Sequence, residues 1–137
     1  MRLGIVASRF NPEITAELLK RAQDAARELG VESSVLSVPG ALEIPLALQW
    51  LAQSGHFHAL AGVGVVIRGE THHFEIVANE SARGLMDVSL EYGLPIANGI
   101  LTTEDEAQAR SRLDKGAEAV RVAVEMAKLK ERMDENR

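Results

Sequence analysis

The sequence contains no cysteine among its 137 residues, which excludes disulfide bonds and thiolate chemistry. Aromatic residues make up only 4%, so any core must be built from Val, Leu, Ile and Ala. No apolar run reaches the roughly 18 residues that a membrane-spanning helix needs, and Arg9 interrupts the first apolar segment too soon for a signal peptide. We therefore expect a cytoplasmic protein that has no membrane partner.

The sequence also lacks an excess of basic residues. Its formal net charge is −5, which argues against a chain whose main task is to neutralise a nucleic-acid backbone. The hydrophobic fraction of 46% is typical of a globular fold. The length suits one domain, so we expect a single domain over residues 1–137.

Four apolar segments that predict strands alternate with helical patterns. The strands are expected at residues 3–7, 34–38, 59–67 and 95–101, and the helices at 11–29, from 43, 74–92, 103–112 and from 116. Such alternation requires a parallel sheet with right-handed crossovers. The sequence therefore predicts an α/β fold, a flavodoxin-like three-layer α/β/α sandwich with a four-stranded parallel sheet.

Local patterns give further expectations for the helices. Asn11 and Pro12 are expected to open the first helix, and Thr102 or Thr103 to cap the short helix at 103–112. The buried stripe of the second helix is assigned to Leu46, Trp50 and Leu51. Residues 128–137 mix both charge signs and are expected to be a solvated helix end.

The turn at residues 68–73 is the most informative segment, because it joins the most apolar strand to a helix. Open α/β sheets bind ligands at such carboxyl ends of strands, and free N–H groups at a helix start favour phosphate. His72 and His73 lie in this turn, and imidazole titrates near neutral pH. Either histidine could act as a general acid or base, and residue type alone does not distinguish them.

The other strand ends bring further polar groups to the same edge of the sheet. Phe10 follows the first strand, where its ring could stack on a flat heterocycle or pack beneath the first helix. Glu43 could serve a helix dipole or accept hydrogen bonds from substrate hydroxyls. His56 and His58 precede the strand at 59–67 and are expected to lie away from the site. Arg112 and Lys115, taken alone, are solvated charges.

Neither a cofactor fingerprint nor a metal motif is recognised. Gly64 and Gly69 do not form a dinucleotide-binding pattern, and no Walker loop is present. No cluster of ligating residues has a spacing familiar from zinc sites.

Five segments together resemble the 6,7-dimethyl-8-ribityllumazine synthase family. They are ASRFN at 7–11, VPGALEIP at 38–45, GVVIRGETHHFEIVANES at 64–81, PIANGILTT at 95–103 and DKGAEA at 114–119, in the family's order. The resemblance implies a transferase that condenses 5-amino-6-(D-ribitylamino)uracil with 3,4-dihydroxy-2-butanone 4-phosphate. This is the penultimate step of riboflavin biosynthesis; it releases phosphate and water and uses neither a metal nor an organic cofactor.

The resemblance also implies roles for individual residues. The pyrimidine would stack on Phe10 and the phosphate would bind to the amides of Glu70 and Thr71. His73, two residues after Thr71, would be the catalytic histidine. The remaining substrate contacts would come from Ala41, Leu42 and Glu43 for the ribityl chain, Val65, Val66 and Ile67 for the pyrimidine, and Arg112 and Lys115 of a neighbouring subunit.

The chain departs from the family's pattern near the proposed site. Asn98 occupies a place that is often aromatic, so that wall of the pyrimidine site would be more polar. Asp114 replaces the usual Asn before Lys115. The segment before Lys115 is shorter than in many members, which leaves Arg110 as the alternative to Arg112.

The resemblance implies a homo-oligomer, either a pentamer or an assembly of pentamers, and an association with riboflavin synthase. Two other functions stay open at this point. One is the archaeal type of riboflavin synthase, and the other is a non-catalytic shell protein that binds flavin or lumazine. The segments at 39–45 and 69–74 favour the synthase over the first, and the candidate acid/base and phosphate-binding groups argue against the second.

Overall fold

The computed structural model describes residues 1–136. Arg137 lies outside the described residues; it is the last residue of the predicted domain and of the charged stretch that begins at residue 128. Its centre is a four-stranded sheet of order β2-β1-β3-β4 in which every pairing is parallel. The strands are β1 (Arg2–Ser8), β2 (Glu32–Val38), β3 (Ala59–Ile67) and β4 (Ile96–Thr103). The predicted parallel sheet is therefore confirmed, with β2 at an edge.

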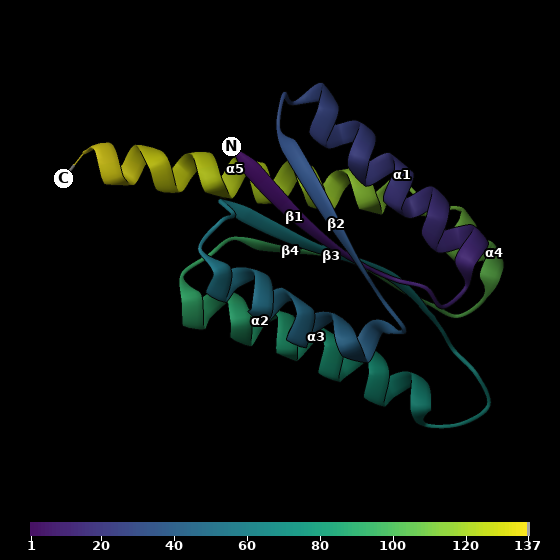
Figure 1. The fold of residues 1–137 in the computed structure, drawn as a ribbon. Coiled ribbons are helices and arrows are strands. Elements are labelled where there is room, and N and C mark those ends of the chain that lie inside the picture. Colours follow the sequence, from purple (N-terminus) through teal and green to yellow (C-terminus); the bar gives the residue numbers. More distant parts are fainter. Residues whose placement is uncertain (137) are drawn as a thin grey trace.

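Helices cover both faces of the sheet (Figure 1). One face carries α1 (Pro12–Glu28), α4 (Glu106–Arg110) and α5 (Lys115–Glu135), and the other carries the 3-10 helix η1 (Ala41–Glu43), α2 (Ile44–Ser54) and α3 (His73–Tyr92). This is the predicted three-layer α/β/α sandwich. Among residues 1–136, no helix combines the length and the apolar character that crossing a membrane requires.

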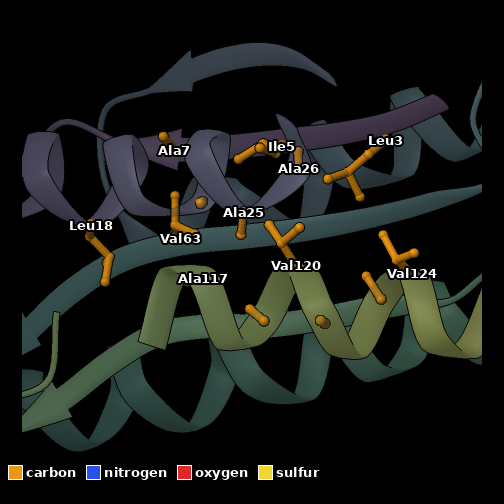
Figure 2. Packing of buried hydrophobic residues seen from close by; sticks show 14 of the residues in the cluster. Leu3, Ile5, Ala7, Leu18, Ala25, Ala26, Val63, Ala117, Val120 and Val124 are labelled. Carbon is orange, nitrogen blue, oxygen red and sulfur yellow. The ribbon is translucent and has the colours of Figure 1, made fainter. Parts of the chain in front are cut away.

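Two hydrophobic clusters fix the helices to the sheet. Figure 2 shows the cluster beneath α1 and α5, which includes Leu3 and Ile5 of β1, Leu18 of α1 and Val120 of α5. A second cluster lies beneath α2 and α3 and includes Val6. All of β3 except Ile67 is buried, as expected for a strand covered on both faces.

Gly116 sets how closely α5 approaches α1. A Cβ atom at this position would overlap the backbone carbonyl of Leu18 in α1. The carbonyl cannot move without distorting α1, so only glycine allows this contact. The contact fixes the start of α5 and therefore the position of Lys115 beside it.

The structure corrects the predicted face of α2. Leu46 and Trp50 are 51% and 57% exposed, and the buried residues are Ile44, Ala47 and Leu48. The buried stripe follows the i, i+3, i+4 spacing from Ile44, which sits on the sheet beside Gly62 and Gly64. The predicted Leu51 is half-buried and packs against the buried cluster beneath α2 and α3. Leu46 and Trp50 misled the prediction, because they lie on the face turned away from the sheet.

The structure also corrects the start of α4. Neither Thr102 nor Thr103 is the cap; Asp105 is, and its Oδ1 accepts a hydrogen bond from the amide of Gln108 at 2.8 Å. The threonines instead complete β4, which extends through Thr103. Asn11 does precede α1 as predicted, but its side chain makes no capping hydrogen bond.

Candidate functional site

A pocket of about 480 Å³ opens where β1, β2 and β3 end. Ala41, Val66 and Val77 of its lining belong to the cluster beneath α2 and α3, and the pocket lies at the carboxyl edge, where ligands bind in open α/β sheets. Its lining is Phe10, Asn11, Pro39, Gly40, Ala41, Leu42, Glu43, Val65, Val66, Ile67, His73 and Val77. Segments far apart in the sequence therefore meet in one cavity.

Phe10 stands at the wall of this pocket with 70% of its surface exposed. The chain leaves β1 through Asn11, which has a left-handed backbone (φ 56°, ψ 63°) that asparagine tolerates better than most residues. The amide of Arg9 donates to the carbonyl of Val38 at 2.9 Å, which ties this exit to the end of β2. The ring is thus free to stack, and the alternative that it packs beneath α1 is wrong.

Glu43 ends η1 and also lines the pocket. Its Oε1 accepts a hydrogen bond from the amide of Gly40 at 2.9 Å. This bond closes the turn at residues 40–43 and orients the carboxylate at the pocket. The geometry is compatible with both predicted roles, because a carboxylate has several acceptor sites.

The backbone of β3 is open toward the pocket at residues 65–67. Strand β1 pairs with β3 only as far as Ala7 and Val63, whereas β4 continues alongside to Ile67. Residues 65–67 therefore have a strand beside them on the β4 side only. This open edge offers backbone donors and acceptors to a flat heterocycle in the pocket.

The two histidines of the turn lie in different places. His73 is the first residue of α3 and lines the pocket, whereas His72 and the exposed residues Glu70 and Thr71 are not among the lining. The amide of His73 donates to Oγ1 of Thr71 at 3.3 Å, which ties the turn to the helix start. Position in the fold thus distinguishes the histidines, which residue type could not do.

Arg68 forms the main electrostatic cluster at the edge of the site. Its guanidinium bonds the carboxylates of Glu75 in α3 and Glu104 after β4. The pKa of Glu75 is held below its ordinary value by its own backbone amide and by the hydrogen bond from Arg68. The two carboxylates likewise raise the pKa of Arg68.

Three other predicted residues do not reach the pocket of their own chain. Arg112 is exposed in the connection between α4 and α5, and Lys115 begins α5 on the opposite face of the sheet. Asn98 is exposed on the edge strand β4, where its Oδ1 accepts from the amide of Ile100 at 2.9 Å.

Arg110, the alternative to Arg112, is already engaged within its chain. It pairs with Glu106 at 2.7 Å and with Glu13 of α1 at 3.3 Å. These two carboxylates raise its pKa and leave less of its positive charge available to an anion. The geometry therefore favours Arg112 as the cation that could serve another chain.

Sequence reasoning assigned no site role to Asn11, Pro39, Gly40 or Val77, which also line the pocket. Val77 follows His73 by one helical turn, so a helical spacing counted from His73 could have found it. Among residues 1–136, no group of three or more His, Asp or Glu side chains is arranged to hold a metal ion.

Comparison with known proteins adds an independent finding. The family model for 6,7-dimethyl-8-ribityllumazine synthase matches residues 1–131. Relatives that bear this name are similar over nearly the whole chain. The protein of Nitrosomonas europaea is 56% identical, over 97% of this chain and 84% of its own. Those of Cupriavidus pinatubonensis and Burkholderia vietnamiensis are 52% identical, covering 94% and 98% of this chain and 80% and 82% of theirs.

Proposed function

The chain belongs to the 6,7-dimethyl-8-ribityllumazine synthase family, and from this membership we infer its reaction. It is a transferase of riboflavin biosynthesis that condenses 5-amino-6-(D-ribitylamino)uracil with 3,4-dihydroxy-2-butanone 4-phosphate. The products are 6,7-dimethyl-8-ribityllumazine, phosphate and water. The matching family and the names of the relatives do not favour the archaeal type of riboflavin synthase or a non-catalytic shell protein.

We propose that the pocket beside β3 is the active site. The observation that carries this proposal is that Phe10, Glu43 and His73 line one cavity although they come from three separate segments. The exposed Phe10 ring suits stacking on the pyrimidine. Ala41, Leu42 and Glu43 suit the ribityl chain, and the open backbone edge at Val65, Val66 and Ile67 suits the polar rim of the ring.

His73 is the proposed catalytic residue. Imine formation between the amine and the ketone, elimination of phosphate and ring closure each move a proton, and one imidazole can accept and return them. The phosphate leaves beside the amides of Glu70 and Thr71, which precede a helix start where anions are favoured. Holding the two substrates together contributes the remaining, entropic part of catalysis.

We propose that a second copy of the chain completes each site with its Arg112 and Lys115. Support comes from apolar side chains that a single chain leaves exposed on α2 and α3, among them Trp50 at 57% and Leu90 at 75%. A groove of about 410 Å³ runs between these helices and shares Leu42 with the pocket. A neighbour seated there would therefore lie next to the site.

The proposed assembly is a pentamer or a set of pentamers, and association with riboflavin synthase is proposed with it. We further propose that residues 1–137 form a single domain and that the protein resides in the cytoplasm, which cell fractionation would test. Neither a metal nor an organic cofactor takes part in the proposed reaction.

The direct test supplies purified protein with both substrates and follows lumazine fluorescence together with free phosphate. We expect the two products to appear at equal rates. Conversion of added lumazine to riboflavin would instead identify a riboflavin synthase. Tight lumazine binding without turnover would identify a binding protein.

A further inference from the structure

The Arg68 side chain connects three elements at the edge of the proposed active site. It follows the last residue of β3, and its amide donates to the carbonyl of Thr103 at the end of β4 at 2.9 Å. Its Nη1 bonds Oε1 of Glu75 at 2.5 Å, and its Nε lies 3.0 Å from Oε2 of Glu104. One guanidinium thus joins β3, the first turn of α3 and the segment that follows β4.

The same guanidinium lies over the ring of Phe74, 4.6 Å from its centroid. Phe74 and Glu75 directly follow His73, so Arg68 contacts the first turn of α3 through both a ring and a carboxylate. Single exposed ion pairs contribute little to stability. An arginine fork that bonds two carboxylates and covers a ring gives a better-defined geometry than any one of these contacts.

The turn at residues 69–72, between Arg68 and His73, makes few contacts of its own. A Cβ atom on Gly69 would meet nothing within 4 Å, and Glu70, Thr71 and His72 are exposed. The bond between the His73 amide and Thr71 lies inside this segment and does not attach it to the sheet. The position of the turn relative to the pocket therefore depends on what holds its two ends.

We propose that Arg68 is a positioning residue, which holds residues 69–73 so that the phosphate-binding amides lie beside the pocket that His73 lines. This inference rests on the proposed function of that turn. Arg68 does not itself line the pocket, and its single positive charge faces two carboxylates. The cluster carries a formal charge of −1, which would not attract a phosphate. The role is therefore structural support of the reacting groups.

Arg68→Ala tests the proposal, with Arg27→Ala as the matched control. Arg27 also forms an exposed ion pair, with Asp24 at 2.9 Å, but it lies in the last turn of α1. We expect kcat of Arg68→Ala to fall about 10- to 100-fold, since small displacements of reacting groups cost this much. KM for the sugar phosphate should rise while KM for the pyrimidine stays near that of the wild type. Arg27→Ala should match the wild type.

Removal of the carboxylates distinguishes positioning from direct phosphate binding. Glu75→Gln combined with Glu104→Gln leaves Arg68 in place but weakens both of its ion pairs. Positioning predicts the same losses as in Arg68→Ala, and predicts no further loss when all three changes are combined. If the freed Arg68 instead bound the sugar phosphate as tightly as before or more tightly, the proposal would be overturned.

Two further measurements test the proposal: the activity of Arg68→Lys and the binding of inorganic phosphate. Lysine retains the charge but not the fork, so Arg68→Lys should recover only part of the activity; full recovery would contradict the proposal. Calorimetric titration with inorganic phosphate should show about tenfold weaker binding to Arg68→Ala than to the wild type. Unchanged phosphate binding by Arg68→Ala would refute the inference, and this readout does not require turnover. A wild-type protein that makes no lumazine would count against the proposed reaction instead.

Discussion

Position 73 is where a small change in sequence should have the largest chemical effect. His73 lines the pocket and its neighbour His72 does not, although both are exposed. We expect His73→Ala to slow lumazine formation about 10²- to 10⁴-fold, the usual contribution of a general acid or base. His72→Ala is the matched control and should change turnover by less than about twofold. Steady-state fluorescence assays measure both, and a slower His72 variant would reverse the assignment.

Phe10 offers a test of binding in place of chemistry. Because its ring is 70% exposed, Phe10→Ala should leave the thermal midpoint of unfolding nearly unchanged. Loss of a stacking surface costs about 1–3 kcal/mol, so KM for the pyrimidine should rise about tenfold or more. Phe10→Tyr keeps the aromatic face and serves as the control. A stable Phe10→Ala protein with an unchanged KM would show that the ring does not hold the substrate.

Acid should loosen the contact between Arg68 and Glu75. The pKa of Glu75 is lowered in the folded protein from its ordinary value of 4.5, by its own amide and by Arg68. A lowered carboxyl pKa stabilises the fold at pH values above the ordinary one, and this contribution disappears as the pH falls through the lowered pKa. The difference in unfolding free energy between wild type and Glu75→Gln should therefore be constant near neutral pH and shrink below about pH 4.5.

Urea unfolding of both proteins at a series of pH values measures that difference. A difference that stays the same down to about pH 3 would contradict the assignment of the shift to the ionised pair.

At the scale of the elements, the approach of α5 to α1 depends on Gly116. Gly116→Ala should destabilise the protein by about 1–3 kcal/mol through overpacking, although alanine is the better helix former. Gly69→Ala is the control for stability, because nothing lies near that Cβ position. Denaturant unfolding measures both variants, and equal stabilities would show that α5 can shift away from α1 at little cost.

Periodicity predicted the elements well because each strand and helix must bury one continuous set of side chains. The limits of β3 and the buried face of α5 follow directly from their apolar positions. Periodicity failed at α2, where Leu46 and Trp50 form a second apolar stripe that the sheet does not cover. It also could not tell that β4 continues through Thr103 and leaves the capping of α4 to Asp105.

Part of the site was predictable because the predicted fold determines where the strands end. Parallel strands bring their carboxyl ends to one edge, so Phe10, Glu43 and His73 could be expected to meet. The left-handed backbone at Asn11 and the three-way contact of Arg68 had no signal in the spacing of residues. Both depend on long-range packing, which fixes backbone angles and rotamers only in the folded chain.

At the scale of the whole molecule, a single chain leaves apolar side chains of α2 and α3 exposed, and the proposed site takes Arg112 and Lys115 from a second chain. Arg112 and Lys115 do not line the pocket of their own chain, which is consistent with the proposal that they contact the site of a neighbouring chain. Mass measurement in solution would show whether the protein forms one ring, paired rings or a closed shell. A fully active monomer would contradict a site that two chains share.

The most direct measurement mixes two variants that are each expected to be slow, His73→Ala and Lys115→Ala, and lets them assemble together. If neighbouring chains share each site, some pockets in a mixed ring combine an intact His73 with an intact Lys115 from the adjacent chain. Random mixing in equal amounts should then restore about a quarter of the wild-type rate. A mixture that is no more active than its separate components, although mass measurement shows mixed assemblies, would contradict the shared site.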